Sequence, residues 1–136
     1  MQRINFLDLK EQYLQIKQEA WAAMEKVMDQ TAFSGGPFVA SFEDKFAQWT
    51  GAKYAVGISN GTIALQLAFQ TLGIGHGDEV IVPANTFIAT AWGVSHAGAT
   101  PVFVDCTADT WEIDPALIEA KITPKTKAIA GVHLYG

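Results

Sequence analysis

The residues best placed for chemistry lie in the turn Ser59–Thr62, where a short apolar run ends and a helical pattern begins. The run predicts a strand over Tyr54–Ser59, and apolar spacing of three and four predicts a helix over Thr62–Leu72. A turn that opens a helix leaves backbone N–H groups unpaired at the positive end of the helix dipole. Such a turn can hold a phosphate. An ordinary connection between a strand and a helix is the alternative.

Two common nucleotide sites are disfavoured at this turn. No Gly-Lys-Ser or Gly-Lys-Thr follows it, as a Walker loop requires, and the Gly-x-Gly-x-x-Gly dinucleotide fingerprint is missing. Asn60 and Gly61 are also a common hairpin pair, but no alternating strand follows them.

A second candidate is Phe87, which comes shortly after a predicted strand, Glu79–Pro83. Open parallel sheets bind their ligands at the carboxyl ends of their strands, so this ring could stack on a flat ligand. A core aromatic is the alternative, because most aromatic side chains serve burial. His133 and Tyr135 end the last predicted strand at the same edge and are further candidates.

The remaining reactive residue types point to no metal site. His76, His96 and His133 lie far apart, without the short spacings of metal ligands. Cys106 is the single cysteine, so it forms no internal disulfide and indicates a reducing compartment. Its composition-based interpretation is a small buried hydrophobe.

Composition limits the function classes. A chain of 136 residues fits one domain. Its net charge of −5, with its lysines scattered, argues against nucleic acid or an anionic membrane as a partner. The sequence has neither a signal-peptide pattern nor an apolar run of about 18 residues, so we expect a soluble cytoplasmic protein.

The elements that must position the candidates alternate along the chain. Near-continuous apolar strands predict an α/β fold with a parallel sheet. Two helices precede it, one that begins near Leu9 behind the cap Asp8 and one from Pro37 to a stop at Gly51. The first carries an apolar stripe typical of a core or an interface. The later elements are predicted as helices over Thr86–His96 and Asp114–Ile122 and strands over Glu79–Pro83, Pro101–Asp105 and Thr126–Leu134. No linker interrupts them, so residues 1–136 form a single domain, with N-terminal helices over 1–52 and a β/α portion over 53–136.

Several segments together resemble one family. They are Ser-Asn-Gly-Thr-Ile-Ala-Leu (59–65), Gly-Asp-Glu-Val-Ile-Val-Pro-Ala-Asn-Thr-Phe-Ile-Ala-Thr (77–90), Gly-Ala-Thr-Pro-Val-Phe-Val-Asp (98–105), Ile-Thr-Pro-Lys-Thr-Lys-Ala-Ile (122–129) and the closing Val-His-Leu-Tyr-Gly. In order and spacing the chain resembles the DegT/DnrJ/StrS-type sugar aminotransferases over essentially its whole length.

The resemblance implies a mostly parallel sheet, as in the large domain of fold-type-I enzymes that use pyridoxal 5′-phosphate (PLP). It implies transfer of an amino group from glutamate to a nucleotide-linked keto-deoxysugar, in a homodimer or higher homo-oligomer. By position, Gly61, Thr62 and Ile63 would hold the PLP phosphate through backbone N–H groups and the Thr62 hydroxyl. Phe87 would stack on the pyridine ring.

One departure limits the activity. The family's Schiff-base lysine and the aspartate that pairs with the pyridine nitrogen lie downstream of residue 136, and none of the eight lysines here stands in the lysine motif. A PLP enzyme needs both groups, so we predict no catalytic residue in this chain and no transamination by it alone. The resemblance also implies that strands encoded later separate the strand at Tyr54–Ser59 from the other three. A non-catalytic structural or interaction protein, or part of a PLP-dependent sugar dehydratase, is the alternative.

Overall fold

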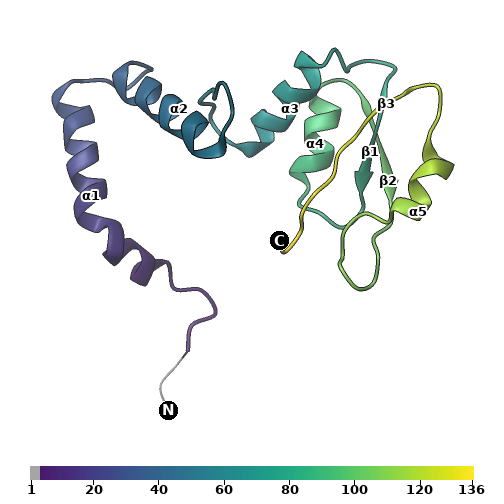
Figure 1. Cartoon of the computed structure of the whole chain (residues 1–136), viewed down its shortest axis with the longest axis horizontal. Helices are drawn as coiled ribbons and strands as arrows, with labels where there is room; N and C mark the ends of the chain where they lie inside the picture. Colours follow the sequence, from purple (N-terminus) through teal and green to yellow (C-terminus); the bar gives the residue numbers. More distant parts are fainter. Residues whose placement is uncertain (1–3) are drawn as a thin grey trace. The chain divides into compact units, whose positions relative to one another are not determined.

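The computed structural model describes residues 4–136 and divides into two compact units, a first that ends at Gly57 and a second, Ile58–Gly136. The first unit is helical, and the described strands all belong to the second (Figure 1). The candidate residues Gly61, Thr62, Ile63 and Phe87 therefore all lie in the second unit.

The first helix, α1 (Leu9–Asp29), begins where the sequence predicts. Asp8 caps it, because its carboxylate accepts a hydrogen bond of 3.0 Å from the backbone N–H of Glu11. That bond, with one from the Asn5 side chain, holds the pKa of Asp8 below its ordinary value. α1 buries none of its own residues. Its apolar stripe instead borders an open groove of about 600 Å³, lined by Trp21, Ala23, Met24, Val27, Met28 and Phe38.

The second helix, α2 (Pro37–Thr50), also matches the prediction, with proline in its first turn and Gly51 in the left-handed region (φ 73°) as its stop. The segment that follows does not. The predicted strand over Tyr54–Ser59 is wrong, because no strand is present there. The backbone N–H of Gly57 donates to a side-chain oxygen of Glu43 at 2.6 Å, so α2 and not a neighbouring strand satisfies this backbone.

The second unit alternates helices and strands, which confirms the α/β fold. Its elements are α3 (Gly61–Thr71), β1 (Glu79–Pro83), α4 (Ala89–His96), β2 (Thr100–Val104), α5 (Pro115–Ile118), a 3₁₀ turn (Glu119–Lys121) and β3 (Thr126–Ile129). The helix predicted from Thr86 begins only at Ala89, and the one predicted over Asp114–Ile122 is split. The strand predicted over Thr126–Leu134 ends at Ile129, because its pairing with β1 stops there. The last hydrogen bond at this end of the pair runs from the N–H of Ala130 to the Ile81 carbonyl.

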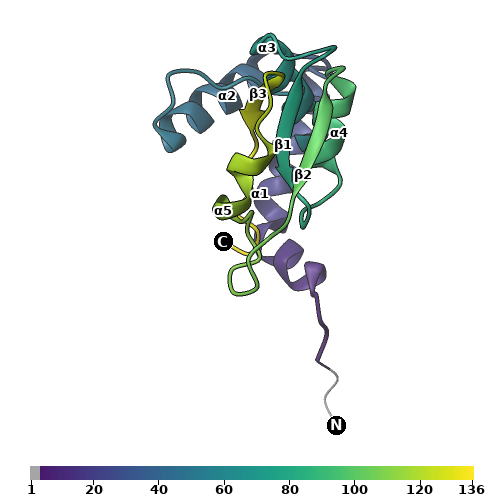
Figure 2. The same ribbon diagram turned by 90° about the vertical axis from the view of Figure 1, so that its right-hand side faces the viewer.

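The three strands form one parallel sheet in the order β2-β1-β3. The central strand is covered on both faces, since Val80, Ile81 and Val82 are completely buried. Figures 1 and 2 show α4 and α5 on opposite sides of these strands. Because the strands are parallel, their carboxyl ends meet at one edge of the sheet, where the loops after β1 and β2 begin.

The core joins this sheet to α3, which carries Gly61, Thr62 and Ile63, and to α4, which follows Phe87 in the chain. Val80 and Val82 pack with Phe69 of α3 and Val94 of α4. Helices α3 and α4 approach closely at Gly93, where an added Cβ would lie 2.6 Å from the Cβ of Leu65. The core thus packs α3 and α4 together against the central strand.

Candidate functional site

The start of α3 offers the first part of the site. The first backbone hydrogen bond of the helix runs from the N–H of Ala64 to the Asn60 carbonyl, at 3.1 Å. Among the hydrogen bonds of residues 4–136, the backbone N–H groups of Gly61 and Thr62 and the Thr62 hydroxyl have no partner. These groups are unpaired donors at the positive end of an 11-residue helix, which suits an anion.

Ile63 differs from its two neighbours. Its backbone N–H donates to the Asn60 side-chain oxygen at 3.0 Å, so the helix cap already uses this donor. Ile63 was expected to donate its N–H to the phosphate, but the Asn60 side chain competes for this donor. Asparagine is a favoured cap residue, so that signal was present in the sequence.

Phe87 lies in the loop between β1 and α4, beyond the carboxyl end of the central strand. Its side chain is 73% exposed, so it takes no part in the core of the described chain. The backbone around it is held, since the Phe87 carbonyl accepts from the N–H of Thr90 at 3.1 Å. The ring is therefore free for contact with a ligand.

A hairpin between β2 and α5 reaches the same loop. Asn85, two residues before Phe87, donates from its side chain to the carbonyl of Trp111 at 3.4 Å. The hairpin is closed by an antiparallel bridge between Cys106 and Ile113. Cys106, for which composition predicted burial, is only partly buried there. Sequence reasoning did not single out Asn85 or Trp111.

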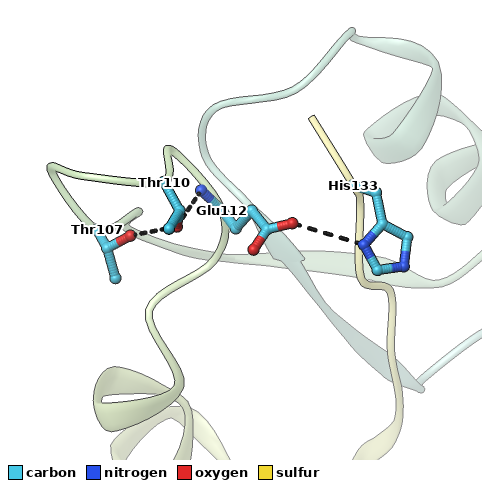
Figure 3. A network of polar contacts seen from close by, with 4 residues as sticks. All are labelled: Thr107, Thr110, Glu112 and His133. Carbon is cyan, nitrogen blue, oxygen red and sulfur yellow. Dashed lines mark hydrogen bonds and ion pairs between the residues drawn. The ribbon is translucent and has the colours of Figure 1, made fainter. Parts of the chain in front are cut away.

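The hairpin also contacts the segment after β3. Glu112 and His133 point toward each other, with 3.5 Å between Glu112 Oε1 and His133 Nδ1 (Figure 3). His133 is otherwise 96% exposed, and Tyr135 has a positive φ of 67° and an exposed ring. Residues that follow the three strands thus lie near one another at this edge, although His133, expected within the last strand, lies past the end of β3.

The other histidines lie elsewhere. His76 is exposed in the turn before β1, and His96 stacks on Trp92 in the last turn of α4, with 6.4 Å between ring centroids. Between residues 4 and 136, no three His, Cys, Asp or Glu side chains gather as metal ligands would. None of the helices in that range combines the length and apolar character that crossing a membrane requires.

Comparison with known proteins defines the class. The chain is 47% identical over 133 residues to a UDP-2-acetamido-2-deoxy-3-oxo-D-glucuronate aminotransferase of Pseudomonas aeruginosa, covering 98% of this chain and 37% of the relative. It is 48% identical over 134 residues to a dTDP-3-amino-3,4,6-trideoxy-alpha-D-glucose transaminase of Streptomyces venezuelae, covering 98% of this chain and 35% of the relative. The chain spans about a third of the length of these curated relatives, which are nucleotide-sugar aminotransferases.

Solved structures agree with this class. DesV from S. venezuelae matches with a TM-score of 0.95 at 47% identity, over 100% of this chain and 37% of that one. NtdA from Bacillus subtilis, solved with bound cofactor PMP, matches with a TM-score of 0.94 at 35% identity, over 100% of this chain and 32% of that one. The family model for DegT/DnrJ/EryC1/StrS aminotransferases matches residues 14–136. The chain belongs to this DegT/DnrJ/EryC1/StrS aminotransferase family.

The residues present fit the phosphate and ring of PLP, with one exception. A phosphate needs hydrogen-bond donors with open space before them, and Gly61 has no atom within 4 Å of where a Cβ would lie. Thr62 adds a hydroxyl, and Phe87 offers an exposed ring. The exception is the Ile63 N–H, which a phosphate would have to share with Asn60.

Proposed function

We propose that this chain is the N-terminal part of a PLP-dependent aminotransferase that moves an amino group from glutamate to a nucleotide-linked keto-deoxysugar. The observation that carries the proposal is the set of unpaired donors on Gly61 and Thr62 at the start of α3, in a chain of this family. The choice of glutamate and of a deoxysugar rests on the family resemblance. Residues 1–136 would form one incomplete large domain.

Gly61 and Thr62 would bind the phosphate through their N–H groups, and the Thr62 hydroxyl would add a third hydrogen bond. Phe87 would orient the cofactor by covering one face of its ring and keeping water from that face. When bound, PLP supplies an electron sink that carries the amino group between substrates. Ile63 would contribute its N–H only if the Asn60 side chain rotates away.

We further propose that none of the eight lysines acts as the Schiff-base lysine. In the second unit, Lys125 precedes β3, and its carbonyl accepts from the N–H of Glu79 at the amino end of β1. Lys121 lies still further before β3. Lys125 therefore lies at the amino edge of the sheet, opposite the carboxyl edge beyond which Phe87 lies. The chain alone would bind the cofactor without the covalent step.

Titration of the 136-residue chain with PLP tests both statements. Visible absorbance and phosphorus NMR should report saturable binding, and pyridoxal, which lacks the phosphate, should bind at least about tenfold more weakly because it loses the charge-assisted hydrogen bonds. Borohydride reduction followed by mass spectrometry should label no single lysine stoichiometrically. A stoichiometric adduct on one lysine would contradict the absence of a catalytic lysine, and no binding of PLP or phosphate at millimolar concentration would contradict the anion site.

We also propose that the chain self-associates, as the family resemblance implies. The apolar surface of α1 around Trp21, Met24 and Met28 supports this, because large exposed apolar patches are typical of interfaces. Sedimentation velocity should show a concentration-dependent dimer or larger species that Met24→Lys shifts toward monomer. A monomer at all concentrations would contradict it.

A further inference from the structure

Trp111 has a backbone conformation that its side chain does not favour. Its φ is +62°, in the left-handed region where glycine or asparagine is usual and a bulky side chain is strained. Burial does not compensate for this, because Trp111 is 51% exposed. Strained residues cluster at ligand-binding sites, so this exposed tryptophan is a candidate for contact with a ligand.

Several hydrogen bonds within the hairpin fix this backbone conformation. The N–H of Thr107 donates to the Glu112 carbonyl at 2.9 Å, and the N–H of Trp111 donates to the Thr107 carbonyl at 3.1 Å. The Thr107 and Thr110 hydroxyl oxygens lie 2.7 Å apart, and the Glu112 N–H donates to the Thr110 hydroxyl at 3.4 Å (Figure 3). These bonds hold the backbone of Trp111 in place.

The hairpin places Trp111 at the carboxyl edge of the sheet. Its carbonyl binds the Asn85 side chain, two residues before Phe87, and the next residue, Glu112, pairs with His133 after β3. Ligands of open parallel sheets bind at this edge. Trp111 therefore lies beside the loop that carries Phe87, and polar groups of Asn85, Glu112 and His133 lie on or next to this hairpin.

We propose that Trp111 is a stacking platform for a ring of the nucleotide-linked sugar substrate. This rests on the proposed function, because only a substrate that extends from the cofactor would reach beyond Phe87. The nucleobase of such a substrate presents a flat face to an indole, and the pyranose presents a face of apolar C–H groups. The polar neighbours suit the hydroxyl groups that surround either ring.

Titration of the 136-residue chain with dTDP-glucose, followed by tryptophan fluorescence and saturation-transfer NMR, tests this proposal. Trp111→Asn should weaken binding about tenfold or more, since a stacked base contributes by about that factor. Trp111→Phe, which keeps a ring, should restore binding to within about threefold of the original chain. The matched control is Trp92→Gln, because Trp92 is 48% exposed in the same unit but lies in α4, where it stacks on His96.

Two further measurements separate a binding role from a structural one. The thermal unfolding midpoint of Trp111→Asn should not fall, because asparagine tolerates a positive φ. Titrations with dTDP and with glucose 1-phosphate show which ring stacks: the base if only dTDP loses affinity in Trp111→Asn, the sugar if only glucose 1-phosphate does. Either result supports the platform.

The proposal is overturned if dTDP-glucose fails to bind at millimolar concentration, or if Trp111→Asn binds as tightly as the original chain. It is also overturned if Trp111→Asn and Trp92→Gln lose equal affinity. PLP binding measured on the same samples distinguishes this failure from failure of the proposed function. If the chain binds PLP but Trp111→Asn does not change the affinity for dTDP-glucose, only the stacking role of Trp111 is rejected. If Trp111→Asn weakens dTDP-glucose binding but the chain does not bind PLP, only the cofactor assignment is rejected.

Discussion

The Asn60 side-chain oxygen accepts a hydrogen bond of 3.0 Å from the backbone N–H of Ile63 and so caps α3. We predict that Asn60→Ala lowers the free energy of unfolding by about 1 kcal/mol, the usual effect of losing such a cap. Urea denaturation followed by circular dichroism measures this. Asn60→Ser should lose much less, since serine also caps helices, and an equal loss for both variants would contradict the capping role.

Thr62 tests the anion site directly. We predict that Thr62→Val weakens PLP binding about tenfold to a hundredfold, because a hydrogen bond to a charged group contributes about 1.5–3 kcal/mol. Titration by visible absorbance measures the affinity. The matched control is Thr71→Val at the other end of α3, whose hydroxyl donates to the Ala68 carbonyl at 3.0 Å. Equal affinities for both variants would show that Thr62 does not touch the phosphate.

Gly93 tests the close approach of α3 and α4. An added Cβ would lie 2.6 Å from the Cβ of Leu65, with backbone atoms of Leu65 and Gln66 at 3.2 and 3.3 Å. We predict that Gly93→Val destabilises the chain by about 1–3 kcal/mol through overpacking. Gly75→Ala is the control, since its Cβ would meet only the Ala97 carbonyl at an ordinary 3.5 Å. Urea denaturation should separate the two variants, and equal midpoints would refute this packing.

The acid dependence of the hairpin follows from Asp109. Hydrogen bonds from the Thr107 hydroxyl and from the Thr110 backbone N–H lower the pKa of this carboxyl. A lowered folded pKa means that ionised Asp109 supports the hairpin above its unfolded pKa of about 3.9 and that this support is lost as the pH falls through the folded value.

We therefore predict that Thr107→Val raises the pKa of Asp109 toward its ordinary value. An NMR titration of the carboxyl carbon between pH 2 and pH 6 would measure it, and Thr50→Val in α2 should leave it unchanged. An unaltered Asp109 titration in Thr107→Val would mean that the threonine hydroxyl does not bind the carboxylate.

Local patterns predicted those elements that local interactions define. The beginnings of α1 and α2 depend on residues next to them, Asp8 and Pro37, and both were predicted correctly. The apolar run at Val80–Val82 predicted a strand covered on both faces, and all three residues are completely buried. The location of Phe87 just past a strand followed from chain order alone.

Elements that depend on a neighbour in space were predicted less well. Tyr54–Ser59 has the residue types of a strand, but a strand needs an adjacent ladder, and Gly57 pairs with Glu43 instead. The strand predicted over Thr126–Leu134 was too long for the same reason, because its pairing with β1 stops at Ile129. The hydrogen bond between Asn85 and Trp111 spans 26 positions, so no local pattern could have indicated it.

The sequence by itself determined the α/β class, the family resemblance and the helix-opening turn at Gly61 and Thr62, because these depend on residue types at short spacing. Only the tertiary structure decided that Asn60 takes the Ile63 donor, that Phe87 is exposed and that Trp111 stands at the same edge of the sheet with a strained backbone. Hydrogen bonds and burial depend on which chain segments meet, and the pairing of β1 with β2 and β3 brings those segments together.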